Sequence, residues 1–287
     1  MMDLKHIIYF GKRQFLSELH SPKVILGYLI ALTGIFQVIR PYMGYVGEMN
    51  KIQLGEVFIL LFNTKFSISY LLLGLFLVLS DAPFMNAVNF TAIYRSRRNN
   101  WLFGMFTYIL LQTMTYYGFI LAGSFLLSMS KAFIVNAWSR PFYNLVFYKP
   151  AAAMEQWGLW YPSEYLLERF TPWEAVFHSF MLIFLYSMIL AIILFIFNLN
   201  YHWIVGSVLT FGIHFIGYII ANNSMFIQAR FSLFANSILE WHDGLTDYMM
   251  TVSFSYILYG IILFVLIIVA SWMIKYTDFR ASVSGKL

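Results

Sequence analysis

The amino-acid sequence predicts an all-α polytopic membrane protein: six transmembrane helices, an N-terminal helix in the membrane interface, and a cytoplasmic helical segment between the second and third spans. Two observations predict this class. Of the 287 residues, 61% are hydrophobic and only 11% are charged, whereas a soluble domain carries roughly twice that share of charge. Several uncharged apolar runs also reach the length of about 20 residues that a helix needs to cross a bilayer, and they lack the alternation of membrane β-strands.

An amphipathic helix is predicted for residues 3–19. Its apolar side chains share one face at helical spacing, namely Leu4, Ile8, Phe15 and Leu19. Such a helix lies along the membrane interface instead of crossing it. Charges occur throughout this stretch and no apolar core leads to a cleavage site, so we expect no cleavable signal peptide. Ser21 and Pro22 then suit the cap and the first turn of the next helix.

Six apolar segments predict the membrane spans, at about 23–45, 66–80, 102–129, 172–197, 203–221 and 252–274. The second is short, and we expect it to borrow neighbouring residues. Residues 46–65 contain an apolar patch interrupted by charge, which favours an interfacial position over a further span. The fourth span has a marked start, because Thr171 and Glu174 fit a capping box with Pro172 at the first helical position.

The distribution of charge orients the chain. With the N-terminus inside, the inner segments carry ten Lys and Arg against four Asp and Glu, whereas the outer segments carry eight against nine. Because positive residues favour the cytoplasmic side, we expect a plasma-membrane protein with both termini in the cytoplasm. The net charge of +5 fits loops near anionic lipid and not nucleic acid. The extracellular segments 130–171 and 222–251 are aromatic or apolar, and we expect both to fold back against the outer leaflet.

The stretch "SDAPFMNAVNFTAIYRSRRNNW" between spans two and three is a candidate handle for a soluble partner. Ser80 or Asp81 suits a helix N-cap and Pro83 its first turn, about three turns of helix follow, and the arginines suit a helix C-terminus. Trp101 would mark the return into the membrane. The alternative is a loop whose arginines only obey the positive-inside rule. That rule does not explain a capped, moderately apolar helix, so we favour the handle.

The motif "LLSDAPF", followed by "YRSRRNNWLFG" at the next span, resembles permease subunits of bacterial ABC transporters of the exporter (type-2 permease) superfamily, particularly a Gram-positive group. The order of the predicted elements is similar too. The resemblance implies that Asp81 to Trp101 form the coupling helix that docks on an ATPase subunit. Its apolar residues would fit a groove on the motor and its arginines would pair with acids or lipid phosphates: Phe84, Val88, Phe90 and Tyr94, then Arg95, Arg97 and Arg98. The segment 130–171 is longer and more aromatic than we expect for this family.

A separate motor is also expected because the chain has no G-x-x-x-x-G-K-[ST] loop to cradle nucleotide phosphates. The resemblance implies ATP and Mg in the partner ATPase, no cofactor or catalysis in this chain, contact with membrane lipids, and a second permease copy or a sister permease. The expected substrate is a peptide, an antimicrobial or a lipid.

Two other functions stay open. An intramembrane enzyme, a protease or a lipid-modifying protein, would use His178 and His214, because ionisable residues at membrane depth are functional candidates. The simpler interpretation, which we favour, is two neutral histidines hydrogen-bonded between helices. A peptide-sensing or immunity protein would need no ATPase at all. No metal site is expected: the acidic stretch "ILEWHDGLTD" with Glu240 and His242 matches no zinc signature, and reads as a polar turn.

Overall fold

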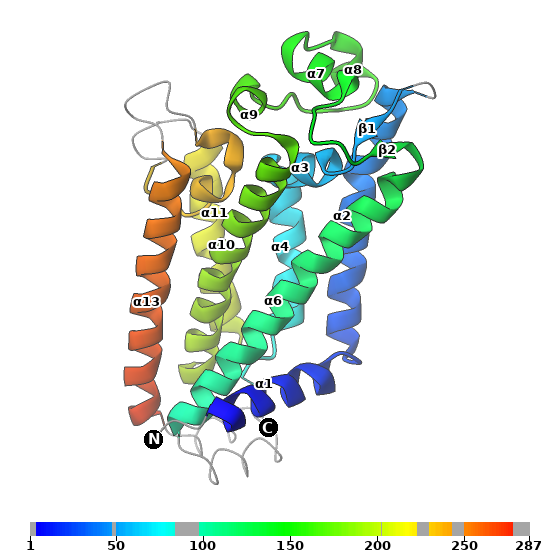
Figure 1. Cartoon of the computed structure of the whole chain (residues 1–287). Helices are drawn as coiled ribbons and strands as arrows, with labels where there is room; N and C mark the ends of the chain where they lie inside the picture. Colours follow the sequence, from blue (N-terminus) through cyan, green and yellow to red (C-terminus); the bar gives the residue numbers. More distant parts are fainter. Residues whose placement is uncertain are drawn as a thin grey trace.

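In the computed structural model the chain is described over residues 4–47, 50–83, 98–201, 203–222, 230–242 and 250–277. The long helices run side by side and form a bundle (Figure 1). A short helix, α1 (Leu4–Glu18), lies across one end of the bundle, and α7 (Arg140–Phe147) lies beyond the opposite end. We name these the α1 end and the α7 end.

Within the described residues, five helices are long and apolar enough to cross a membrane. They are α2 (Pro22–Val46), α6 (Arg98–Ser128), α10 (Pro172–Asn200), α11 (Trp203–Asn222) and α13 (Val252–Tyr276). A sixth helix, α4 (Lys65–Leu79), has 15 residues and meets the same standard only together with α3 (Glu56–Asn63), from which it is bent by 89°. The predicted spans agree with these helices within a few residues, and the chain is a multi-pass, helical membrane protein.

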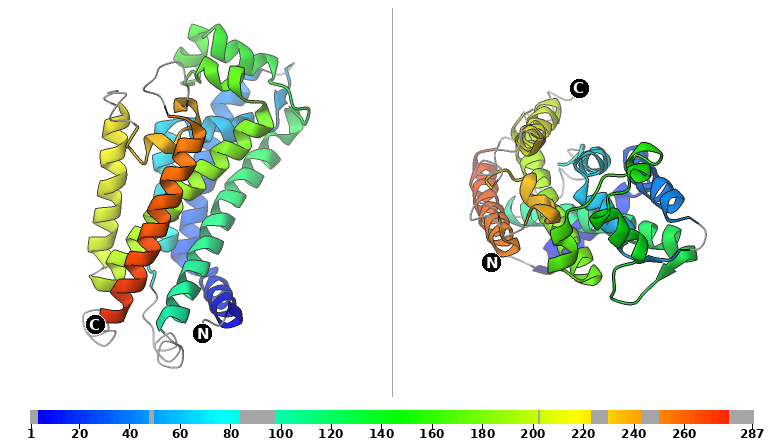
Figure 2. Two further views of the ribbon diagram at one scale, coloured as in Figure 1. Left: turned by 60° about the vertical axis from the view of Figure 1, so that its left-hand side comes forward. Right: turned by 90° about the horizontal axis from the view of Figure 1, so that it is seen from above.

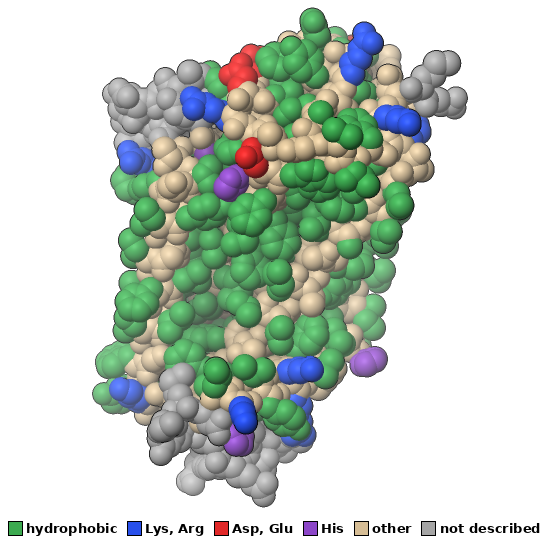
Figure 3. Space-filling view, viewed as in Figure 1, with side chains coloured by type: hydrophobic (Ala, Val, Ile, Leu, Met, Phe, Trp, Pro, Cys, Tyr) green, Lys and Arg blue, Asp and Glu red, His purple; other side chains and the backbone are tan. Residues whose placement is uncertain are grey.

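The surface has the pattern that a bilayer imposes. On the face shown in Figure 3, charged side chains gather at the two ends and the belt between them is largely hydrophobic. Helices α11 and α13 are the least buried of the five, since only 28% and 17% of an 18-residue apolar stretch of each are buried inside the protein. In water this exposure would be unfavourable, whereas lipid tails accept it.

The connections between the long helices carry the shorter elements. The 3-10 turn η1 (Met129–Lys131) leads into β2 (Ala132–Phe133), which pairs in parallel with β1 (Ile52–Gln53) in the register Ile52 to Ala132 and Gln53 to Phe133. Helices α8 (Ala151–Glu155) and α9 (Glu164–Arg169) follow α7. Before α13 lie two further 3-10 turns, η2 (Ala235–Ser237) and η3 (Leu239–Trp241).

Helix α10 is the centre of the bundle. It packs against α3, α6, α11 and α13, and it lies in the middle of the view from above (Figure 2). Of an 18-residue apolar stretch of α10, 67% is buried inside the protein. Its start is the predicted capping box: the Thr171 backbone N–H donates to the Glu174 carboxylate over 2.9 Å, with Pro172 in the first turn. The expected cap of α2 is only partly formed, because Ser21 occupies the cap position without a side-chain hydrogen bond.

Two segments expected at the interface are instead buried in protein. All residues of α3 are buried, although the charge within 46–65 predicted an interfacial position. Residues 232 and 234–239 are buried as well, and the Phe234 ring packs against Tyr186, His214 and Tyr218. In both segments apolar side chains find protein contacts in place of lipid, and the polar groups among them find protein hydrogen-bond partners.

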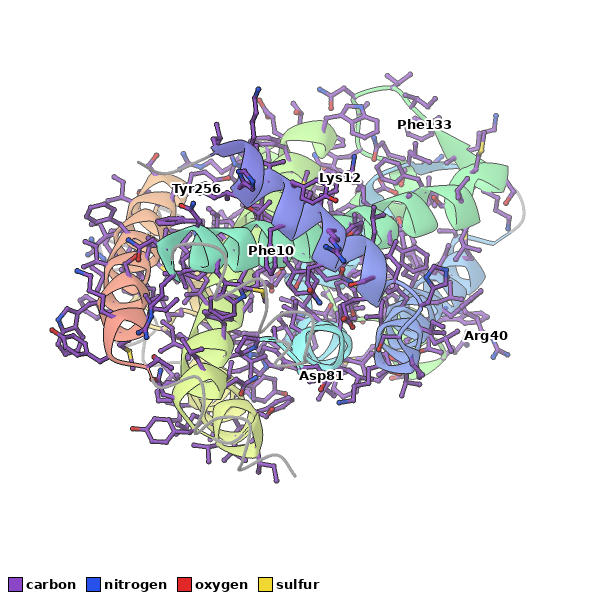
Figure 4. All side chains as sticks on the ribbon, turned by 90° about the horizontal axis from the view of Figure 1, so that it is seen from below. Phe10, Lys12, Arg40, Asp81, Phe133 and Tyr256 are labelled. Atoms are coloured by element: carbon purple, nitrogen blue, oxygen red, sulfur yellow. The ribbon has the colours of Figure 1, made fainter. Side chains whose placement is uncertain are left out.

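A pair of glycines brings α1 onto α6. A Cβ atom on Gly11 would lie 2.7 Å from the backbone oxygen of Gly104, and one on Gly104 would lie 3.3 Å from the Cβ of Phe10. Figure 4 shows α1 crossing α6 at this point, seen from below. The buried face of α1 is Ile7, Gly11 and Gln14. Of the face predicted to be apolar, Leu4 and Ile8 are exposed, which leaves them available to lipid.

Enlarging Gly11 should displace α1. We expect Gly11→Leu to lower the thermal unfolding temperature of the detergent-solubilised protein by about 4 °C or more, because the new side chain meets backbone that cannot move aside. Gly118→Leu on α6 is the matched control, since a Cβ there meets nothing within 4 Å. An unchanged unfolding temperature in Gly11→Leu would show that α1 is not held by this contact.

Candidate functional site

The connection between α4 and α6 is the first candidate site. Six of its eight predicted coupling residues lie outside the described residues: Phe84, Val88, Phe90, Tyr94, Arg95 and Arg97. The other two, Asp81 and Arg98, are described, and both lie at the α1 end, where α4 ends and α6 begins.

The start of this connection is bonded to two other helices. Asp81 forms an ion pair with Lys23 in the first turn of α2, with 2.5 Å between Nζ and Oδ1. The buried amide of Asn198, near the end of α10, donates to the carbonyl oxygens of Ala82 over 2.8 Å and Ser80 over 3.2 Å. A Cβ on Gly206 of α11 would collide with the Asn198 side chain. The start of the connection is therefore held by α2 and α10.

The end of the connection is bonded to the last helix. The Arg98 guanidinium donates to three backbone oxygens at the end of α13: Ile274 over 3.1 Å, Lys275 over 2.8 Å and Thr277 over 3.4 Å. The last carbonyls of a helix have no partner within it, and a cation there is favourable. Arg98 thus has internal bonds that its predicted role in docking did not include.

Trp101 corrects a further expectation. Its side chain is 1% exposed and its ring lies 6.1 Å from that of Phe195 on α10. It is therefore a core residue of the first turn of α6 and not an interfacial marker of re-entry. The helix itself begins earlier than predicted, at Arg98.

At the α7 end, the buried carboxylate of Glu56 organises a second polar site. It accepts four hydrogen bonds: from the Tyr42 hydroxyl (2.8 Å), the Gln53 backbone N–H (3.1 Å), and the backbone N–H and hydroxyl of Ser139 (both 2.8 Å). Ser139 is also the N-cap of α7, and its hydroxyl accepts from Phe142. One carboxylate therefore joins α2, β1, α3 and α7, which explains how a charged residue stays buried.

The two membrane histidines are each bonded between helices. The Nδ1 of His178 lies 2.7 Å from the Tyr256 hydroxyl of α13. His214 lies between the Tyr186 hydroxyl, 2.9 Å from Nδ1, and Ser69 Oγ, 3.0 Å from Nε2. Because Ser69 donates to the Lys65 carbonyl, its hydroxyl accepts from His214, and every group in this chain of bonds is satisfied. The favoured interpretation of neutral, helix-bridging histidines fits this geometry better than the activation of Ser69 as a nucleophile.

The polar turn predicted around residues 242–244 lies outside the described residues beyond His242. His242 is buried, its Nε2 lies 2.7 Å from Ser255 Oγ, and its Nδ1 lies 2.9 Å from the Ile238 carbonyl. Burial lowers the pKa of His242 to about 4, so the ring is neutral. Asp243 and Asp247 lie outside the described residues, and within the described part of the chain no group of three His, Cys, Asp or Glu is placed to hold a metal ion.

Glu240, two residues earlier, lies beside a cavity together with Lys65. Burial raises the pKa of the Glu240 carboxyl to about 7, against the lowering effects of the Ser163 backbone N–H and of the Lys65 charge. The backbone N–H of Glu240 donates to the Asn63 side chain over 2.9 Å. The sequence offered only the acidic character of this stretch, not its position against α3 and α4.

Removing the Glu56 carboxylate should destabilise the α7 end. Glu56→Ala leaves buried N–H and O–H donors without an acceptor, at about 1–3 kcal/mol for each unsatisfied group. We expect the thermal unfolding temperature in detergent to fall by about 6 °C or more. Glu164→Ala is the control at the same end, because Glu164 forms a half-exposed pair with Lys149 and such pairs contribute little. Equal effects of the two substitutions would contradict the importance of the Glu56 site.

No protein-family model, curated protein or solved structure matches the chain. The resemblance of the segment 80–101 to ABC permeases therefore has no matched relative behind it.

Proposed function

We propose that the chain is the membrane-spanning subunit of an ABC-type exporter, driven by ATP hydrolysis in a separate ATPase that docks on the segment 81–101. ATP and Mg would bind to that ATPase. Two membrane subunits, copies of this chain or this chain and a sister permease, would form the path for the substrate.

The observation that carries this proposal is the bonding at both ends of the segment. Asp81 is paired with α2, the backbone at Ser80 and Ala82 is held by Asn198 of α10, and Arg98 is bonded to the end of α13. A force applied between these two points reaches three membrane helices besides α4 and α6 through polar contacts of defined geometry. A loop that only connects two spans needs no such contacts.

The charge at the α1 end supports a cytoplasmic position for it. Among the described residues there, six are basic and two are acidic: Lys5, Lys12, Arg13, Lys23, Arg98 and Lys275 against Glu18 and Asp81. Positive residues near the ends of spans favour the cytoplasm, where an ATPase would find its nucleotide. In this orientation the aromatic α7 end faces outside, toward a substrate such as an amphipathic peptide or a lipid.

The first test is purification of the tagged chain from its native host in mild detergent. We expect a stoichiometric ATPase to co-elute. The double variant Phe84→Asp with Val88→Asp should reduce the co-eluting ATPase by about tenfold or more, because charge is placed in a predicted apolar contact. The control Lys149→Ala with Glu164→Ala alters the opposite end and should leave the ATPase bound. Arg98 is a poor probe of docking, because its loss also removes the cap of α13.

Elution of the chain without any nucleotide-hydrolysing protein would contradict the proposal. The enzyme alternative would then be tested with His178→Phe and His214→Phe, which an exporter should tolerate after a modest loss of stability and an enzyme should not.

A further inference from the structure

A cavity of about 290 Å³ lies at the α7 end, where α4 begins, α11 ends and η3 passes. Its lining combines two opposite charges with aromatic rings: Lys65, Glu240, Phe66, Trp160, Tyr218 and Trp241. The volume equals that of about ten liquid water molecules, which suits a small polar group of several heavy atoms. Neither the coupling proposal nor the histidine pairs involve this cavity.

The ammonium group of Lys65 is held in a fixed position. Its Nζ donates to the Ala221 carbonyl over 2.9 Å and to the Asn222 side chain over 3.1 Å, and it lies 4.9 Å from the centre of the Trp241 ring. An ammonium has three N–H donors, and two of them are used by acceptors among the described residues, so within that part of the chain one remains for a further acceptor. The side chain therefore presents a positioned positive charge to the cavity.

The carboxylate of Glu240 is positioned by different groups. One of its oxygens, Oε2, accepts from the Ser163 backbone N–H over 3.2 Å. Glu240 and Lys65 line the same cavity, yet these two described side chains form no ion pair with each other. At a pH above about 7, where the Glu240 carboxyl is ionised, two opposite charges thus face one cavity without neutralising each other by contact.

We propose that this cavity, the 65/240 pocket, binds a zwitterionic head group, with the ammonium of the ligand toward Glu240 and its oxyanion toward Lys65. A ligand with a single charge would be attracted by one of the two side chains and repelled by the other, whereas a zwitterion satisfies both. The aromatic side chains of Trp160 and Tyr218, which line the cavity, would add cation–π attraction for the ammonium.

The head group could belong to a lipid or to a soluble molecule, and the surroundings of the pocket suit both. Phe66 at the rim is exposed, as are Phe215 and Ile219 on α11, so an acyl chain would meet apolar surface. Trp, Tyr and Lys are also the residues that favour the boundary between lipid and water. The chemistry recognised, an ammonium together with an oxyanion, is the same in either case.

Binding to the full chain, purified in a non-ionic detergent, tests the proposal by isothermal titration. The probes are lysophosphatidylethanolamine, lysophosphatidic acid with the same tail and phosphate but no ammonium, and free phosphoethanolamine. We expect the ethanolamine lipid to bind about tenfold more tightly than lysophosphatidic acid. Glu240→Gln, which keeps an acceptor for the Ser163 N–H, should reduce that ratio to about one. Lys65→Gln should weaken both lipids by a similar factor and leave their ratio unchanged.

Glu164→Gln is the matched control, since it removes an exposed carboxylate at the same end, and the ratio should stay at its original value. Equal binding of free phosphoethanolamine and of its lysolipid would identify a soluble zwitterion as the ligand, and binding of the lysolipid alone would identify a lipid. The proposal is overturned if the unmodified protein binds neither ethanolamine probe, does not distinguish the two lipids, or keeps the preference in Glu240→Gln. Thermal unfolding of each variant without ligand shows whether the pocket is still folded.

Discussion

The buried carboxylate of Glu56 is the constraint on which the α7 end depends. A charge without partners at this depth would cost several kcal/mol, so the chain has to bring donors to it from distant positions. Tyr42 comes from α2, Gln53 from β1, and Ser139 from the cap of α7. Satisfying one side chain therefore fixes where α3 crosses the bundle and where the 130–171 segment lies. The bend of 89° between α3 and α4 interrupts the helix. Such a break is accepted next to a membrane span because protein, and not lipid, surrounds α3.

The spans were the most predictable part of the fold. Each apolar run has the length of a bilayer crossing, and the capping pattern at Thr171 and Glu174 is local in sequence, so both can be read directly. The burial of α3 and of residues 234–239 could not be read, because an apolar run next to a charge is the same pattern for an interfacial segment and for a buried one. What distinguishes them is the partner of the charge, and the donors to Glu56 lie up to 83 residues away in sequence.

The candidate sites also have a part that could be predicted from the sequence and a part that could not. Composition and local motif identified Asp81 and Arg98, but Lys23 and Asn198 became visible only when the helices were assembled, since nothing local relates residue 81 to residue 23 or residue 82 to residue 198. The 65/240 pocket illustrates the limit most clearly. Lys65 and Glu240 are 175 positions apart; in sequence Lys65 reads as an ordinary charge just before a span, and Glu240 as part of an acidic stretch outside the membrane. His178 and His214 are the opposite case. They are conspicuous in the sequence, and the structure shows that each is hydrogen-bonded to side chains of other helices.

The central position of α10 also has a consequence for biosynthesis. Helix α10 packs on α3 and α6, which precede it, and on α11 and α13, which follow it. A ribosome adding about 5–20 residues per second completes the segment between Ser128 and Pro172 on the order of several seconds before α10 can enter the membrane. During that interval the N-terminal helices have only one another and lipid as neighbours. The paired glycines Gly11 with Gly104 and Gly27 with Gly74 lie in this early half, so the nascent chain can form a packed platform of α1, α2, α4 and α6 on which the later helices assemble.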